Sequence, residues 1–179
     1  MRGRLFVGLQ PPQHLRNRIR LDLAALSDGP ESAWVGADHL HVTLRFLGDV
    51  SVGPEDSDTL RAAFGRVSAR TLSFGPALRL LGERVLVAPV HGADDLAALT
   101  RASVAKAADV TEWDPFFGHL TVSLPGTAGE RDWAQTMAGG ALAGRWPVDE
   151  VCLFMSDNGY RVLDRFPLAP ATAAAGGEG

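Results

Sequence analysis

Two short segments of the chain repeat one pattern of residue types. The first reads His41-Val42-Thr43-Leu44, and the second, 78 residues further along, reads His119-Leu120-Thr121-Val122. Side chains alternate between the two faces of a β-strand, so each histidine would share a face with its threonine, opposite the aliphatic residues. Two such strands beside one cleft would present two imidazoles, which titrate near neutral pH, and two hydroxyls to a small ligand.

The repetition decides between a structural and a functional interpretation of these residues. A lone histidine in a strand is more often a hydrogen-bonded structural residue than a catalyst, and a single His-x-Thr triplet arises easily by chance. Two triplets, each followed by an aliphatic residue and each in a similar part of the chain, favour a functional site.

The segments around the motifs predict alternating strands and helices. Residues 4–9 are apolar and stop at two prolines, which predicts a strand, and the apolar spacing over residues 12–26 predicts an amphipathic helix. We expect Arg16, Arg18 and Arg20 to lie on or beside the outer, solvated face of that helix; a phosphate-binding patch is the alternative. The motif strands are expected at residues 39–48 and 120–124. Further helices are expected at 56–67, 94–108 and 130–142, and further strands at 72–81, 84–90, 148–155 and 161–168.

The two halves of the chain share a strand–helix–strand–helix order, which predicts the fold class. We expect a bilobal α+β fold in which two similar lobes of largely antiparallel sheet, with helices outside, enclose a central cleft. Residues 1–168 would form this single domain. Residues 169–179 are small and have nothing to bury, so we expect a flexible tail.

Composition excludes several classes of protein. Hydrophobic residues make up 46% of the 179 residues and charged residues 21%, which is typical of a soluble globular protein. Acidic residues outnumber basic ones by 21 to 17, which argues against extended, non-specific binding of nucleic acid. The single cysteine, Cys152, makes an internal disulfide impossible and is expected to be buried. With no apolar run long enough for a membrane helix or a signal peptide, we expect a cytoplasmic protein.

The motifs and their flanks resemble the two-histidine phosphoesterase superfamily and, within it, the RNA 2′,3′-cyclic phosphodiesterases, also called 2′-5′ RNA ligases. Besides the two His-x-Thr blocks, the resemblance rests on Arg4-Leu5-Phe6-Val7, Pro11-Pro12, Trp34-Val35, Arg45-Phe46-Leu47-Gly48, Leu153-Phe154, Ser156, Gly159-Tyr160 and Phe166-Pro167-Leu168. Two positions depart from the family pattern. Gly118 stands where proline is common, and Leu124 stands where an arginine often follows the second triplet.

The resemblance implies an enzyme that hydrolyses a 2′,3′-cyclic phosphate to a 2′-phosphate without a metal ion or cofactor, with reverse 2′-5′ ligation by the same site. The substrates would be RNA 3′ ends or small cyclic nucleotides. A membrane or an obligatory protein partner is not expected, and we expect a monomer. A non-catalytic module that binds nucleotides or RNA ends in the same cleft is the alternative.

The resemblance also assigns roles to residues. His41 and His119 would be catalytic, with a preference for His119 as base and His41 as acid that the near-symmetric motifs leave open. Thr43 and Thr121 would donate hydrogen bonds to the phosphate oxygens. Candidate substrate contacts are Arg45, Trp34, Phe117 and Tyr160. For Trp34 and Phe117 the alternative is core packing, and for Arg45 it is a surface ion pair. For His39, an exposed residue without a role is the default interpretation; its spacing of two residues from His41, and not the resemblance, gives the alternative that it shares the strand face of His41 and supports it.

Overall fold

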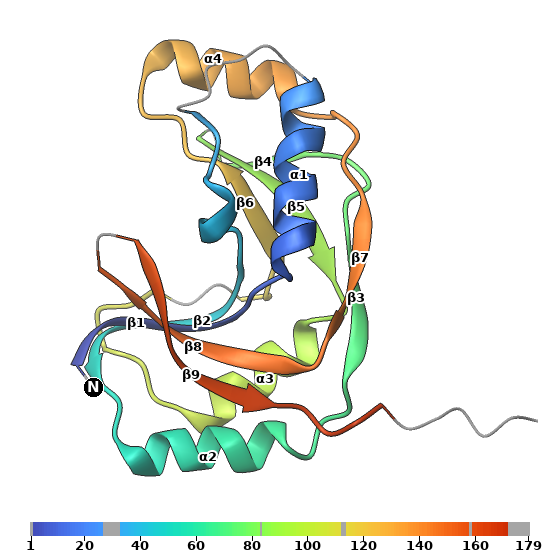
Figure 1. Cartoon of the computed structure of the whole chain (residues 1–179). Coiled ribbons are helices and arrows are strands. Elements are labelled where there is room, and N and C mark those ends of the chain that lie inside the picture. The colour runs from blue at the N-terminus through green and yellow to red at the C-terminus, as the bar shows by residue number, and fades with distance from the viewer. Residues whose placement is uncertain (1, 27–32, 83, 112–113, 158, 172–179) are drawn as a thin grey trace, which may run out of the picture.

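A computed structural model describes residues 2–26, 33–82, 84–111, 114–157 and 159–171 of the chain (Figure 1). The strands of this part are β1 (Arg2–Leu9), β2 (Val42–Ser51), β3 (Arg70–Phe74), β4 (Arg79–Leu81), β5 (Val85–His91), β6 (His119–Ser123), β7 (Gly144–Val148), β8 (Glu150–Ser156) and β9 (Tyr160–Pro167). The helices are α1 (Gln13–Leu26), α2 (Pro54–Phe64), α3 (Asp94–Ser103) and α4 (Ala128–Met137), and a short 3-10 turn, η2, covers Ala37–His39.

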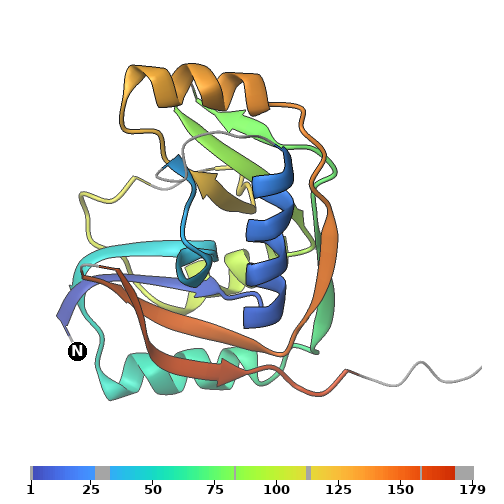
Figure 2. The same cartoon turned by 45° about the horizontal axis from the view of Figure 1, so that its top comes forward.

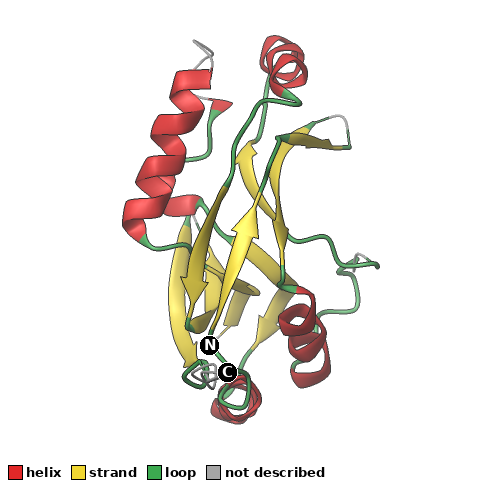
Figure 3. Cartoon of the chain, turned by 90° about the vertical axis from the view of Figure 1, so that its right-hand side faces the viewer, coloured by secondary structure: helices red, strands yellow, loops and turns green. Residues whose placement is uncertain are grey.

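The strands form one curled sheet in which every pair of neighbouring strands is antiparallel. Their order is β7-β3-β5-β6-β2-β1-β8-β9, with β4 attached to β5. The helices lie around the outside of the sheet (Figure 3). The predicted α+β class with a largely antiparallel sheet and outer helices is therefore confirmed.

The sheet divides into two halves that meet at β2 and β6. Strands β1, β2, β8 and β9 are covered by α2 and α3, whereas α4 packs against β5 at the opposite end of the molecule (Figures 1 and 2). Strands β3 and β7 run side by side along the edge that joins the two ends. Consequently β2 and β6, which carry the two motifs, lie where the halves come together.

Alternation along β1 separates the main core from a small aromatic layer. Leu5, Val7 and Leu9 are fully buried in the main core, whereas Phe6 points the other way and packs with Phe154 of β8. The same layer contains Cys152, whose thiol pKa is raised to about 12 by burial, and the prediction of a buried cysteine is confirmed. This aromatic layer faces the motif residues described below.

Several predicted helix boundaries are wrong, and contacts at the helix termini explain where α3 ends and where α4 begins. The helix predicted over residues 94–108 stops at Ser103 because Val104 is extended and Arg45 Nη1 donates to the carbonyls of Arg101 and Val104. The helix predicted over residues 130–142 is α4, which begins earlier because Thr127 and Glu130 form a capping box. The helix predicted over residues 56–67 runs from Pro54 to Phe64.

One predicted strand is divided in the structure, and one strand was missed. The segment 72–81 separates into β3 and β4, which pair with β5 at different points. The segment 148–155 corresponds to β8, and β7, which lies just before it, was not predicted. Within the segment predicted as a tail, Ala169 exchanges backbone hydrogen bonds with Val67 and Ala69. Residues 172–179 of that segment lie outside the described residues.

Candidate active site

The two His-x-Thr motifs lie at adjacent antiparallel strands, with His41 immediately before the first residue of β2 and not inside the strand predicted from residue 39. Val42 of β2 is the direct partner of Leu120 of β6, and both aliphatic side chains are fully buried. One step away in this register, His41 lies across from Thr121 and Thr43 across from His119. The motifs are thus related by a local two-fold arrangement, with both histidines and both threonines on the face opposite the core.

Each histidine is fixed by the same local hydrogen bond. The Nδ1 atom of His41 lies 2.7 Å from the carbonyl oxygen of His39, and Nδ1 of His119 lies 2.8 Å from that of Phe117. A carbonyl oxygen can only accept, so Nδ1 must carry the hydrogen in both rings. Each Nε2 is therefore left to take up a proton when the ring is neutral, or to donate one when it is charged.

The two histidines differ in their surroundings. The ring of His41 lies 4.8 Å from that of Phe6, 6.0 Å from Phe154 and 4.6 Å from Tyr160, as ring-centroid distances. Burial among these rings lowers the pKa of His41 to about 4; the hydrogen bond to His39 opposes the shift, and the nearby His119 adds to it. At neutral pH the free protein therefore holds His41 as a neutral imidazole.

Two adjoining cavities receive these side chains. A cavity of about 520 Å³, here called the His41 cavity, is lined by His41, Thr121 and Tyr160 among others. A second cavity of about 640 Å³, the His119 cavity, is lined by His119, Thr43 and Phe117 among others. Thr43, together with Arg4 and Phe46, borders both cavities. All four motif side chains thus reach one continuous cleft.

Both threonine hydroxyls are available to a ligand. Neither Thr43 nor Thr121 makes a side-chain hydrogen bond to any other residue in the described ranges, and both are half-buried at the cleft. A hydroxyl donates well to a phosphate oxygen on which negative charge increases. The site therefore offers two proton-transfer groups and two neutral donors around one small volume.

The three arginines of the cleft differ in what they contact. Arg45 lines the His119 cavity, but its Nη1 is bound to the main-chain carbonyls at the end of α3. Arg101 Nη1 lies 3.9 Å from Asp114 Oδ1. Arg4 stands 5.1 Å over the ring of Phe46 and has no hydrogen bond or ion pair with any other described residue. Of these three guanidinium groups, only that of Arg4 borders both cavities.

The predicted aromatic contacts take different positions. Tyr160 is 38% exposed in the His41 cavity, and Phe117 is half-buried beside His119 in the other. Trp34 also lines the His41 cavity but is only 8% exposed, because its ring packs edge-on against Trp133. Trp34 therefore forms part of the cavity wall and exposes little of its ring for stacking on a nucleobase.

The two positions that depart from the family pattern lie in different surroundings. A Cβ atom on Gly118 would lie 2.8 Å from the carbonyl oxygen of Val90, whose N–H donates to the Gly118 carbonyl, so the strands approach too closely for a side chain. Leu124 is 58% exposed and lines the His41 cavity, giving it an apolar edge where an arginine would add charge.

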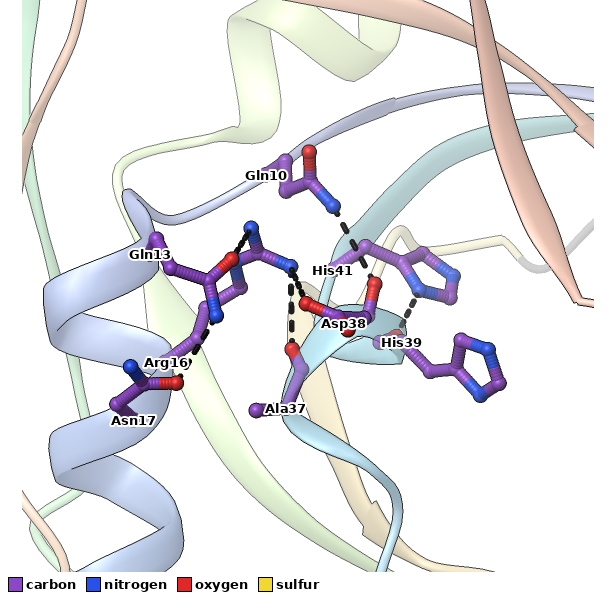
Figure 4. Close-up of polar contacts among 8 residues, drawn as sticks. All are labelled: Gln10, Gln13, Arg16, Asn17, Ala37, Asp38, His39 and His41. Carbon is purple, nitrogen blue, oxygen red and sulfur yellow. Dashed lines mark hydrogen bonds and ion pairs between the residues drawn. The ribbon is translucent and has the colours of Figure 1, made fainter.

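The segment that precedes His41 is not a strand. His39 ends the 3-10 turn η2, so the prediction that it shares a strand face with His41 is wrong. Its main-chain carbonyl, and not its side chain, supports His41. The carbonyl of Ala37 in this turn accepts a hydrogen bond from Arg16 of α1, and that of Asp38 accepts one from Gln10 (Figure 4).

Sequence reasoning missed Arg4 and Arg16. Arg16 is buried, not on a solvated face as predicted. The spacing contained the signal, because Arg16 precedes Ile19 by three residues and Leu23 by seven and so falls on the buried stripe of α1. Arg4 lies in β1, directly before its apolar stretch, and its place in the cleft follows from tertiary structure alone.

Two further features concern metals and membranes. Within the described ranges, His, Cys, Asp and Glu side chains do not form any group of three or more that could hold a metal ion. In the same ranges, the helices lack the length and apolar character that crossing a bilayer requires.

The chain is similar to known proteins in both sequence and fold. It is 33% identical over 124 residues to the RNA 2′,3′-cyclic phosphodiesterase of Escherichia coli (strain K12), covering 66% of this chain and 70% of that protein. A protein of Thermus thermophilus shares the fold with a TM-score of 0.70 and 22% identity, over 95% of this chain and 99% of that one. E. coli LigT complexed with 3′-AMP matches with a TM-score of 0.66 and 27% identity, over 94% and 99% of the two chains. LigT complexed with ATP matches with a TM-score of 0.68 and 27% identity, over 94% and 98%. No family model matches the chain.

Proposed function

This chain belongs to the RNA 2′,3′-cyclic phosphodiesterases of the two-histidine phosphoesterase family, and we propose that it hydrolyses the 2′,3′-cyclic phosphate of RNA 3′ ends or of nucleosides to a 2′-phosphate. His41 and His119 carry the proton transfers, and Thr43 and Thr121 hold the phosphate, without a metal ion. The complexes of LigT with 3′-AMP and ATP support a nucleotide ligand for the same cleft.

One observation carries this proposal: the pairing of Val42 with Leu120 that brings the motifs together. It sets each histidine across from the threonine of the other motif, so both halves of the molecule supply one proton-transfer group and one hydroxyl. In our proposal a cyclic phosphate binds over this pair with one imidazole on each side and both hydroxyls near its non-bridging oxygens. No further group is needed to balance the reaction.

The reaction proceeds by in-line attack of water on phosphorus. The bond from the water oxygen to phosphorus forms as the bond from phosphorus to the ribose 3′ oxygen breaks, and the base histidine takes the proton of the water. The acid histidine gives its Nε2 proton to the departing 3′ oxygen. Thr43 and Thr121 donate to the non-bridging oxygens while charge builds on them. With the 5′-hydroxyl of a second RNA in place of water, the same steps give 2′-5′ ligation: the bond from the 5′ oxygen to phosphorus forms, the bond from phosphorus to the 3′ oxygen breaks, and the 3′ oxygen is protonated.

Electrostatics favour His41 as the base. A base must be neutral before reaction, and burial lowers the pKa of His41 to about 4, so its Nε2 is unprotonated at neutral pH. The sequence alone favoured the reverse assignment, but the two motifs are nearly symmetric and contain no information on burial. His119 then supplies the proton to the leaving oxygen.

Arg4 and the aromatic edges complete the substrate site. Because Leu124 adds no charge to the His41 cavity, we assign recognition of the anionic substrate to the guanidinium of Arg4 at the junction of the cavities. Tyr160 and Phe117 each offer a ring edge or face to a nucleobase, a contact that tolerates any base. Arg45, through its bonds to the end of α3, shapes the His119 cavity.

An assay with a 2′,3′-cyclic mononucleotide in excess chelator tests the function directly. We expect turnover that is unchanged by the chelator, with the 2′-phosphate as product. Binding of the cyclic nucleotide without turnover would instead identify the non-catalytic binding module. Activity that disappears with chelator and returns with a divalent ion would contradict a mechanism based on histidines alone.

A further inference from the structure

Arg16 lies behind the catalytic face and touches neither cavity, yet its contacts lead to His41. We infer that Arg16 is a positioning residue, which orients the His41 imidazole by holding the η2 turn whose carbonyl binds Nδ1. This inference rests on the proposed role of His41. It adds a residue from α1, outside both motifs, to the machinery of the reaction.

The guanidinium of Arg16 is buried between α1 and η2 (Figure 4). Nη1 donates to the carbonyl of Ala37 at 3.2 Å and lies 3.5 Å from Asp38 Oδ1, and Nη2 donates to Oε1 of Gln13. The Asp38 side chain is 82% exposed, so the carbonyl of Ala37 is the better-shielded partner. The main contact of Arg16 with the η2 turn is therefore to the backbone, at the Ala37 carbonyl, and not to the Asp38 side chain.

A short series of backbone hydrogen bonds in the η2 turn connects the Arg16 contact to His41. The Ala37 carbonyl also accepts the N–H of Leu40, and the N–H of His39 donates to Gly36 at 2.9 Å. Gln10 Nε2 donates to the Asp38 carbonyl at 3.4 Å from the other side (Figure 4). With these groups held, the carbonyl of His39 faces Nδ1 of His41 at 2.7 Å.

A comparison with His119 shows why His41 needs such a support. The carbonyl that binds His119 belongs to Phe117, in a segment bound directly to the sheet: Val90 N–H donates to the Gly118 carbonyl at 2.7 Å, and His119 itself pairs with Pro89. The corresponding carbonyl for His41 lies in η2, outside any strand. The sheet orients one histidine, and the α1 arginine orients the other.

Burial of a charged group makes a purely packing role for Arg16 unfavourable. Desolvation lowers the pKa of its guanidinium, an effect that Asp38 partly opposes, and Nε finds no hydrogen-bond partner among the residues the structure describes. An apolar side chain could fill the space without that penalty. Holding a backbone carbonyl in place is what a guanidinium adds at this position.

The test replaces Arg16 with methionine and observes the His41 ring directly. Long-range proton–nitrogen NMR at pH 7 distinguishes a neutral imidazole protonated at Nδ1 from one protonated at Nε2. In Arg16→Met we expect the Nδ1–H form of His41 to lose population, whereas His119 stays unchanged. Arg18→Met is the matched control, because Arg18 lies on the same helix, is exposed and pairs only with Asp22 among described residues. The NMR measurement uses no substrate, so it separates a failure of this inference from a failure of the proposed activity.

Kinetics supply the second measurement. We expect Arg16→Met to lower kcat by roughly 10–100-fold with KM within about twofold, because misplacing a proton-transfer group by an ångström costs about that much. In a His41→Ala background the same substitution should add almost nothing. An unchanged His41 tautomer together with wild-type kcat, or an equal loss in the His41→Ala background, would overturn the inference. If Arg16→Met fails to fold, Arg16→Lys is judged by the same criteria, since it keeps the charge but loses the fork that grips Ala37 and Gln13 together.

Discussion

His41 and His119 make the same hydrogen bond but lie in different environments. Both rings donate from Nδ1 to the carbonyl two residues earlier, so both present Nε2 to the cleft. Only His41 lies against Phe6, Phe154 and Tyr160. The two motifs are nearly symmetric, but their histidines are not equivalent, and the proposed hydrolysis would use this difference because one group must take a proton while the other gives one.

Replacing either histidine tests their shared role. His41→Ala or His119→Ala should each reduce kcat by roughly 10²–10⁴, the range for losing one general acid or base. The double variant should be barely worse than the weaker single variant, because the pair acts as a unit. Steady-state kinetics on a cyclic-ended oligonucleotide give the comparison, and thermal unfolding confirms that each variant is folded. Near-wild-type turnover in either single variant would exclude the two-histidine mechanism.

The pH dependence of kcat/KM tests which histidine is the base. A base works when deprotonated, so activity should rise as the pH passes the lowered pKa of His41, about 4, and not at the usual 6.5. Tyr160→Ala admits water to His41 and should move this rising limb toward higher pH. His14→Ala, an exposed change on α1, should leave it in place. If His41 were the acid, kcat/KM would fall across the same pH range where we expect it to rise.

At the scale of elements, the sequence predicted helices and strands well where a regular apolar pattern extended over many residues. The run over residues 4–9 and the spacing over residues 12–26 correspond closely to β1 and α1. The 3-10 turn before His41 escaped prediction because a turn of three residues has no periodicity of its own. Arg16 was predicted on the solvated face of the helix because it is charged, although its spacing from Ile19 and Leu23 places it on the buried face. The early end of α3 depends on Arg45, a residue distant in sequence.

The close approach of β1 to β2 gives a test at this scale. A Cβ atom on Gly8 of β1 would lie 2.5 Å from the carbonyl oxygen of Val42, so the backbone beside His41 and Thr43 must shift. Gly8→Ala should therefore lower kcat at least tenfold and destabilise the fold by about 1–3 kcal/mol, as overpacking does. Gly129→Ala in α4, where nothing lies within 4 Å, is the control and should be neutral or stabilising. Equal activity of the two variants would show that the spacing of β1 and β2 does not govern the site.

At the scale of the whole molecule, the site exists because two halves of one curled sheet meet. The motif residues and their likeness to a family were visible in the sequence, and the described structure brings all four motif side chains to one cleft. Three properties could not be predicted from the sequence: the burial that lowers the pKa of His41, the absence of room for a side chain at Gly118, and the position of Arg4 between the two cavities. These properties come from contacts between segments far apart along the chain, which no local pattern encodes.

The arrangement of the halves also predicts which ribose oxygen leaves. In-line attack requires the entering water and the leaving oxygen on opposite sides of phosphorus, so the base and the acid must flank it. His41 and His119 reach the cleft from two cavities that share Thr43, which permits that geometry for one orientation of the ribose. We expect the orientation that releases the 3′ oxygen and keeps the phosphate on the 2′ oxygen.

The product of a cyclic-ended oligonucleotide reveals the orientation. After complete digestion, a phosphatase specific for 3′-phosphates should leave the new terminal phosphate in place, while it removes phosphate from a matched oligonucleotide that carries a 3′-phosphate. Arg4→Ala should raise KM without changing this outcome, because the guanidinium at the junction attracts the anion, whereas the two imidazoles determine which bond breaks. Removal of the terminal phosphate by the phosphatase would mean that the 2′ oxygen left, and the ribose would then bind in the reverse orientation between His41 and His119.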